Sequence, residues 1–398
     1  MWSIPDHLID PIVLRDETPA VLFGMAVSPD GRWIATSSQG NANLVLWSTD
    51  DYRTPAANLP MRGPSHSIAF SSDGRWLAAK GDETGVISLW DLRNLASPPV
   101  DLFENAGSAP DTLNFSPDSR WLVSGTWYGD TNIYDVSKES PATTPRYQCA
   151  QDEPVRGRLA FSPDGHHLVT AAHGLSARLW DLTSTDPCTS PRLLRPHNDV
   201  VADVAVSVDY RWAATASFDH KGRLWDITAG EPKLVAEIPF DDRVVQAAFS
   251  PDNRWVAFGS WDRTAKVLDL EGAEAAKPVT LADHAGRILS LVFTPSGRWL
   301  ATGSEDRTIR LWDPSDPSTA PVILRGHEAG VFAIGVTKDG RWIVTGASDG
   351  TVRLWRLKLS DLIDVACQVA GRDLADEEVS TFLAGAHAQH RCTNERPR

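Results

Sequence analysis

The chain has 398 residues, of which 42% are hydrophobic, and it carries a net charge of -14 at pH 7. The acidic balance, without a long basic run, argues against nucleic acid or an anionic membrane surface as the main partner. No segment approaches the roughly 18 consecutive apolar residues of a membrane span. The first residues lack the basic and apolar regions of a secretion signal, so we expect a cytoplasmic protein.

One sequence unit recurs eight times along the chain, with its copies roughly 44 residues apart. A unit of this length with a closing Trp-Asp pair is typical of four strands per copy. The closing position is aromatic in all but one copy. It is occupied by Trp47, Trp90, Tyr134, Trp180, Trp225, Leu268, Trp312 and Trp355.

The eighth copy shows how the strands follow one another. Residues 331–336 form an apolar run, which is typical of a buried innermost strand. A turn at 338–340 leads to a second strand at 342–345. A tight turn at 348–350 leads to a third strand at 351–355, where polar and apolar residues alternate. In the other copies a fourth strand follows the third.

The eighth copy has no fourth strand of its own. Residues 11–15 read Pro-Ile-Val-Leu-Arg, almost the same as the Pro-Val-Ile-Leu-Arg at 321–325 in the seventh copy. We therefore expect residues 12–14 to complete the eighth unit and close a ring, because closure removes the exposed sheet edges of an open array. A ring of seven units with one stray copy is disfavoured, because every copy is well formed.

This pattern resembles the WD-repeat β-propeller family over roughly residues 12–356. The resemblance implies an all-β fold with an eight-bladed propeller at residues 1–358. Members of that family often hold His, Ser or Thr, Asp and Trp in one hydrogen-bonded network per blade, which satisfies polar groups between strands. Three copies match, and we expect the seventh and eighth blades to be braced best. The matching residues are His197, Thr215, Asp219 and Trp225; His284, Thr302, Asp306 and Trp312; and His327, Thr345, Asp349 and Trp355.

A short α-helical extension is predicted at residues 359–398. Helical spacing of apolar residues begins at Leu359, and a second short helix is expected from about residue 376 to 383. Residues 361–378 resemble the end of bacterial multidomain WD-repeat proteins. In those proteins the propeller follows a STAND-type nucleotide-binding switch, a caspase-like protease or a kinase. The resemblance implies either a free-standing propeller or the sensor half of a longer protein with an upstream effector domain.

The four cysteines are too few and too scattered to predict a disulfide framework. They are Cys149, Cys188, Cys367 and Cys392. Cys367 and Cys392 share the C-terminal extension, where they either pair or stay reduced. In a reducing compartment, packed and reduced thiols are the favoured interpretation.

No motif for catalysis or metal binding stands out in the chain. It has no phosphate-binding loop and no Gly-x-Ser-x-Gly motif, and His327-Glu328 lacks the second histidine of a zinc helix. The recurring His and Asp residues are explained by the blade networks. We therefore predict no catalytic residue, no metal and no cofactor. The alternative is a small-molecule- or metal-binding propeller enzyme of the hydrolase or lyase type.

The candidate binding surface comes from aromatic residues outside the repeated positions. The residue before the aspartate of the tight turn between the second and third strands carries a ring in copies three to six, and such clustered aromatics are typical anchors for a partner. The alternative is that they only pad the rim of their blades. We predict a partner-binding surface formed by Trp127, Tyr128, Arg156, Arg158, His173, Phe218, Asp242, Arg243 and Trp261.

An arginine also stands before the first repeated aromatic in seven copies, as Arg75 does before Trp76. We expect these arginines to stack on the neighbouring ring or to pair with an aspartate, with a docking face as the alternative. Together, the features predict a non-catalytic protein–protein interaction scaffold or sensor module in bacterial signalling. Its partner is expected to be a protein rather than nucleic acid or a membrane.

Overall fold

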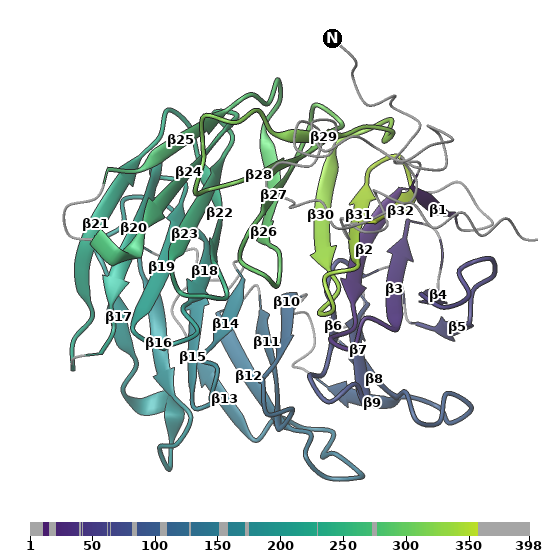
Figure 1. The fold of residues 1–398 in the computed structure, drawn as a ribbon. Coiled ribbons are helices and arrows are strands. Elements are labelled where there is room, and N and C mark those ends of the chain that lie inside the picture. The colour runs from purple at the N-terminus through teal and green to yellow at the C-terminus, as the bar shows by residue number, and fades with distance from the viewer. Residues whose placement is uncertain are drawn as a thin grey trace, which may run out of the picture.

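The computed structural model describes residues 11–15, 21–39, 41, 43–61, 63, 65–81, 86–103, 110–126, 129–150, 158–171, 175–228, 230–272 and 277–356. Within these ranges the strands form eight four-stranded antiparallel sheets, which stand as blades in a ring (Figure 1). The predicted all-β, eight-bladed propeller is therefore confirmed. The predicted helical extension at residues 359–398, with Cys367 and Cys392, lies outside the described residues.

Each blade is numbered by its place along the chain, and its strands are given from the innermost outward. Blade 1 holds β2 (Leu22–Val27), β3 (Trp33–Ser38), β4 (Asn43–Ser48) and β5 (Ala57–Pro60), and blade 2 holds β6 (Ile68–Phe70), β7 (Trp76–Lys80), β8 (Val86–Asp91) and β9 (Val100–Phe103). Blade 3 holds β10 (Pro110–Phe115), β11 (Trp121–Thr126), β12 (Asp130–Asp135) and β13 (Tyr147–Ala150), and blade 4 holds β14 (Leu159–Phe161), β15 (His167–Ala171), β16 (Ala177–Asp181) and β17 (Arg192–Leu194).

The second half of the ring follows the same plan. Blade 5 holds β18 (Val201–Val206), β19 (Trp212–Ser217), β20 (Lys221–Asp226) and β21 (Lys233–Pro239), and blade 6 holds β22 (Val244–Phe249), β23 (Trp255–Ser260), β24 (Thr264–Asp269) and β25 (Val279–Ala282). Blade 7 holds β26 (Ile288–Phe293), β27 (Leu300–Ser304), β28 (Ile309–Trp312) and β29 (Val322–Leu324), and blade 8 holds β30 (Val331–Val336), β31 (Trp342–Ala347), β32 (Thr351–Arg356) and β1 (Ile12–Arg15). Two 3₁₀ turns are described, η2 (Pro187–Thr189) and η3 (Leu270–Gly272).

The turn between the first and second strands has one hydrogen-bond pattern in every blade. In blade 1 the Ser28 hydroxyl accepts the backbone N–H of Trp33 at 2.9 Å and donates to the Asp30 carboxylate. Gly31 takes a φ of 72°, which glycine adopts without steric cost. The same acceptor is provided in the other blades by Ser71, Ser116, Ser162, Ser207, Ser250, Thr294 and Thr337.

The hydrophobic core lies between neighbouring blades rather than inside any one of them. One cluster, for example, packs Trp212 and Leu224 of blade 5 against Val256, Phe258 and Leu268 of blade 6. Similar clusters join the other neighbours in turn, and the inner strand β2 contacts both β6 and β30. Since a single sheet cannot cover its own apolar faces, each blade is stable only beside the next.

Blade 8 combines strands from both ends of the described chain. β1 pairs antiparallel with β32, and Ile12 stands opposite Leu354 in the register. The Leu14 side chain is buried in the cluster that joins blades 8 and 1, which also contains Trp47 and Trp342. The strand that we expected at residues 12–14 is therefore observed as part of this sheet.

Blades 7 and 8 contain the complete polar network that their sequences predict. In blade 7, His284 Nδ1 lies 2.8 Å from an Asp306 carboxylate oxygen, and Nε2 lies 2.8 Å from the Thr302 hydroxyl. Trp312 Nε1 donates to the same hydroxyl at 2.8 Å. Burial lowers the pKa of His284 and so favours the neutral ring, whose Nδ1 also lies 2.6 Å from the Arg310 guanidinium. In blade 8 the same contacts join His327, Thr345, Asp349 and Trp355.

The network of blade 5 is incomplete, and the prediction is wrong there for its histidine. Trp225 Nε1 donates to Thr215 at 2.9 Å, but His197 Nδ1 faces the Arg223 guanidinium at 2.8 Å. His197 Nε2 is buried and has no hydrogen-bond partner among the described residues. The buried Arg223 pairs with Asp219 and, on its other side, with Glu237, each at 2.8 Å. Arg310 of blade 7 pairs with Asp306 in the same way, yet the contact between His284 and Asp306 is kept there.

This difference predicts unequal costs for one substitution in two blades. Thr302→Val leaves both the Trp312 N–H and His284 Nε2 without a hydrogen-bond partner, whereas Thr215→Val does this only to the Trp225 N–H. Each buried polar group without a partner costs about 1–3 kcal/mol, so Thr302→Val should lower the free energy of unfolding about twice as much as Thr215→Val does. Urea unfolding of both variants beside the wild type measures the two costs, and equal losses would contradict the assignment.

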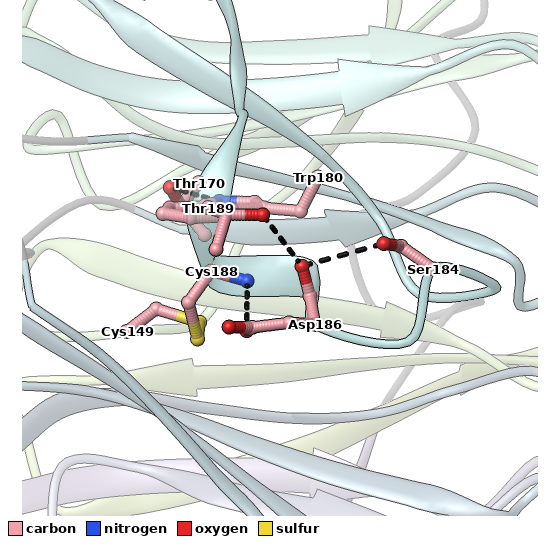
Figure 2. The surroundings of a disulfide bond; sticks show 7 residues. All are labelled: Cys149, Thr170, Trp180, Ser184, Asp186, Cys188 and Thr189. Atoms are coloured by element: carbon pink, nitrogen blue, oxygen red, sulfur yellow. Dashed lines mark hydrogen bonds between the residues drawn. A yellow bond between two sulfur atoms is a disulfide. The ribbon is translucent and has the colours of Figure 1, made fainter.

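A disulfide that the sequence analysis did not predict joins blades 3 and 4. Cys149 in β13 bonds to Cys188 in η2, with 4.8 Å between the Cα atoms and a sequence separation of 39 (Figure 2). The Asp186 carboxylate caps η2 by accepting the N–H of Cys188 at 3.0 Å. The expectation that the cysteines are too scattered to form disulfides was wrong for this pair, because the outer strand of one blade lies beside a loop of the next.

Loss of the disulfide should destabilise the propeller without changing its fold. Closing a loop of this length stabilises a protein by about 4 kcal/mol in the chain-entropy model. Thermal unfolding of Cys188→Ser under non-reducing conditions should therefore show a lower midpoint than that of the wild type. A reducing agent should lower the wild-type midpoint toward that of the variant and leave the variant unchanged. If the wild type does not respond to reduction, the bond does not form.

Candidate functional site

The predicted binding surface lies on the face that we call the turn face. This face carries the turns that follow the second strands, after Ser38, Ser217, Ser260, Ser304 and Ala347. Five residues of the predicted surface are described by the structure, namely Arg158, Phe218, Asp242, Arg243 and Trp261. The other four lie outside the described residues: Trp127, Tyr128, Arg156 and His173.

The register of each blade decides which side chains meet on the turn face. In blade 6 the Trp261 backbone N–H donates to the Arg243 carbonyl at 3.0 Å, which ties the turn to the residue before the inner strand. The equivalent bond in blade 7 joins Glu305 to Arg287 at 2.9 Å. In the five blades whose turn the structure describes, the turn residue therefore lies beside the residue that precedes the inner strand.

Four side chains of blades 5 to 7 meet in what we call the aromatic–arginine cluster: Phe218, Arg243, Trp261 and Arg287. The Phe218 and Trp261 rings are tilted, with centroids 5.8 Å apart. The Arg243 guanidinium lies 4.7 Å from the centroid of Phe218 and 5.2 Å from that of Trp261. The Arg287 guanidinium lies 4.7 Å from Trp261. Each such exposed contact contributes about 0.5–1 kcal/mol and holds the arginine in place.

Arg287 was not among the residues predicted from sequence. It follows Arg243 by 44 positions and precedes the inner strand of its blade in the same way, so its place in the repeat was the available signal. What the repeat alone did not show is that each arginine reaches the ring of the preceding blade. Arg243 of blade 6 lies over Phe218 of blade 5, and Arg287 of blade 7 lies over Trp261 of blade 6.

The carboxylates near the cluster are engaged with other groups. Asp242 accepts the backbone N–H of Arg243 at 2.7 Å. Asp262 accepts the N–H groups of Asp241 and Thr264, at 3.0 and 2.8 Å. Arg287 has a loose ion pair with Glu305, at 3.6 Å. Among the described residues no carboxylate pairs with the Arg243 guanidinium, whose side chain is exposed.

Arg158 lies apart from the cluster, at the start of the inner strand of blade 4. Its backbone N–H donates to Ala202 of blade 5 at 3.4 Å. The neighbouring Asp203 carboxylate is fully buried and accepts the backbone N–H groups of Val204 and Ala247, at 3.0 and 2.9 Å. Burial raises the pKa of Asp203 to about 6, although the positive charge of Arg158 and these hydrogen bonds oppose the shift.

Five arginines of the opposite face stack on the tryptophan that follows them, as the sequence suggested: Arg75, Arg120, Arg211, Arg254 and Arg298. The guanidinium of Arg75 lies 4.3 Å from the Trp76 ring and also pairs with Asp91 at 3.3 Å. Arg254 stacks on Trp255 at 4.8 Å and pairs with Asp269 at 3.4 Å. Both halves of each contact come from the same blade, so these arginines stabilise the fold.

Comparison with known families decides the classification. The family described as "WD domain, G-beta repeat" matches residues 14–48, 62–91, 107–135, 151–181, 188–226, 233–269, 277–313 and 319–356, which is more than half of the chain. The chain belongs to the WD40 repeat family. A search of curated proteins found no match. WD40 propellers generally serve as protein-interaction scaffolds and are typically not enzymes.

Two observations on this WD40 propeller concern other kinds of site. Within the described ranges no group of three or more His, Cys, Asp or Glu residues is placed to hold a metal ion. In the same part of the chain no helix has the length and apolar character needed to cross a membrane.

Asp203 should make the stability of the propeller depend on pH. The folded protein holds this proton more tightly than the unfolded chain, whose aspartates titrate near pH 4, so the stabilising contribution is present below about pH 4 and lost as pH rises through about 6. Asp203→Asn has no proton to lose. The free energy of unfolding of the wild type, relative to this variant, should fall by about 2–3 kcal/mol between pH 4 and 7. Denaturant unfolding at several pH values measures it, and a constant difference would contradict it.

Proposed function

We propose that this WD40 propeller is a non-catalytic interaction module that binds a protein partner through the aromatic–arginine cluster on its turn face. The observation that carries the proposal is the cluster itself. Tryptophan and arginine are the residue types that most often dominate binding energy at protein interfaces. Here two rings and two guanidinium groups from three blades hold one another in place at the surface. A partner that binds them therefore meets little cost of ordering them.

The fold does not require the aromatic residues of the cluster. Gln39 in blade 1 and Ser348 in blade 8 occupy the same turn position as Phe218 and Trp261. They make the same backbone hydrogen bond to the residue before the inner strand, at 2.7 and 3.0 Å. Since the turn forms equally well without a ring, the rings of blades 5 and 6 serve something other than the turn. This comparison favours partner binding over a role in which the rings only fill space at the edge of the blade.

The partner-binding surface includes Asp242 beside the cluster, and we propose that it extends over the neighbouring blades through Arg158, Trp127, Tyr128, Arg156 and His173. The sensor role in a bacterial signalling system rests on the resemblance of residues 361–378 to the end of multidomain WD-repeat proteins. The same resemblance supports an upstream effector or nucleotide-binding domain in a longer protein. The net charge of -14 supports a protein partner over nucleic acid or an anionic membrane.

Removal of the two rings should abolish partner binding with little loss of stability. Phe218 and Trp261 are only half-buried, so Phe218→Ala combined with Trp261→Ala leaves the cores between blades intact. Proteins that co-purify with the tagged wild type from its native host should fall about tenfold or more in abundance with the double variant, as expected for loss of an interface anchor.

A matched control is Val208→Ala, which changes an exposed apolar residue in the turn between the first and second strands of blade 5, on the opposite face. This variant should retain every partner that the wild type binds. Circular dichroism and thermal unfolding check that all three proteins are folded. The proposal fails if the folded double variant retains the same partners in the same amounts as the wild type.

A further inference from the structure

Several arginines that stack on a ring also pair with a carboxylate, whereas Arg243, like Arg211 of the opposite face, has no such pair among the described residues. On the opposite face, Arg75, Arg120 and Arg254 each stack on a tryptophan and pair with a carboxylate of their own blade, at 3.3, 3.6 and 3.4 Å. Arg243 on the turn face has its ring contacts, but no carboxylate pairs with it among the described residues. The chain thus supplies only one half of the arrangement at this position.

The partner that the Arg243 guanidinium lacks is an anion. A guanidinium that stacks on a ring keeps its N–H groups in the plane of the group, where they can bind both oxygens of a carboxylate. The rings of Phe218 and Trp261 restrict the Arg243 side chain, so a ligand meets a group that is already oriented. Asp242 accepts the backbone N–H of Arg243 and makes no ion pair with the Arg243 guanidinium among the described residues.

Further positive charge surrounds Arg243 on the same face. Arg263 follows Trp261 in its turn, and Arg307 follows Glu305 in the next blade. Both side chains are exposed, and no ion pair of either one is found among the described residues. Asp241 is the exposed carboxylate on this loop, and its backbone is fixed by the hydrogen bond to Asp262. Arg243, Arg263 and Arg307 are therefore exposed guanidinium groups without an ion pair among the described residues, on a face that also carries the exposed carboxylates of Asp241 and Glu305.

We propose that the turn face binds a partner polypeptide through an acidic segment, in which an aspartate or glutamate carboxylate pairs with Arg243 and an apolar neighbour packs against Trp261. This inference rests on the proposed function and names the chemistry of its partner. A nucleic acid would bring many phosphates toward a strongly acidic protein and be repelled outside the cluster. A short acidic segment brings far less negative charge and presents a single carboxylate to Arg243, so the structure favours a polypeptide.

The test uses a random peptide library displayed on phage and selected against the immobilised full chain. We expect selected peptides to be enriched in Asp and Glu relative to the starting library. Replacing the acidic residues of the best peptide by Asn and Gln should weaken binding about tenfold or more, as should Arg243→Ala in the propeller. Arg243→Lys keeps the charge but loses the two-point contact, so it should restore binding only in part. Arg298→Ala on the opposite face is the matched control and should bind as the wild type does.

The outcomes separate this inference from the proposed function. Selected peptides without acidic bias, or no selection at all, overturn the acidic-segment proposal. If peptides bind normally to Arg243→Ala but not to the Phe218→Ala and Trp261→Ala double variant, the proposed binding face is supported and the proposed acidic segment is overturned. If neither variant matters, both proposals fall. In a final experiment, a synthetic peptide of residues 359–383 competes with the selected peptides for the propeller. If it displaces the selected peptides at similar concentration, the occupant is the chain's own acidic segment and the assignment to a partner is wrong.

Discussion

The lateral packing of one blade against the next is the constraint on which the rest of this structure depends. Every sheet has two apolar faces, and each face is covered only by a neighbour, as Phe258 of blade 6 is covered by blade 5. The sequence of contacts returns from β30 to β2, and β1 completes the sheet that lies at this junction. A defect in one blade therefore exposes part of two cores, and the ring gains or loses its stability as a whole.

The same packing explains how a surface arises from residues far apart in sequence. Because all blades share one register, equivalent positions of adjacent blades come side by side on the turn face. Phe218, Trp261 and Arg287 meet for this reason, although each belongs to a different blade. A repeated scaffold can thus vary a single turn position without cost to the fold, as Gln39 and Ser348 show. Specificity in such a protein is a local variation on a common backbone.

Buried polar groups show the opposite behaviour, because their partners are fixed by the fold. Asp306 accepts hydrogen bonds from Thr308 and the backbone of Ala285 and contacts His284. Burial alone would raise the pKa of Asp306, but these contacts hold it well below its usual range. Blades 5 and 7 both place a buried arginine beside this aspartate, but only in blade 7 does the histidine also contact the aspartate. Equal sequence motifs therefore do not ensure equal networks.

The sequence by itself determined the number of blades, the four strands of each, and the complete networks of blades 7 and 8. These features follow from repeat spacing, alternation and turn chemistry, which act over short distances along the chain. It also indicated Arg243, Phe218 and Trp261. Only the tertiary structure decided that Arg287 joins them, that Cys149 meets Cys188, and that His197 faces Arg223. Two of these are contacts between neighbouring blades, and the third is an arrangement of buried side chains that differs from the one around His284 in blade 7, so none follows from the pattern of one repeat.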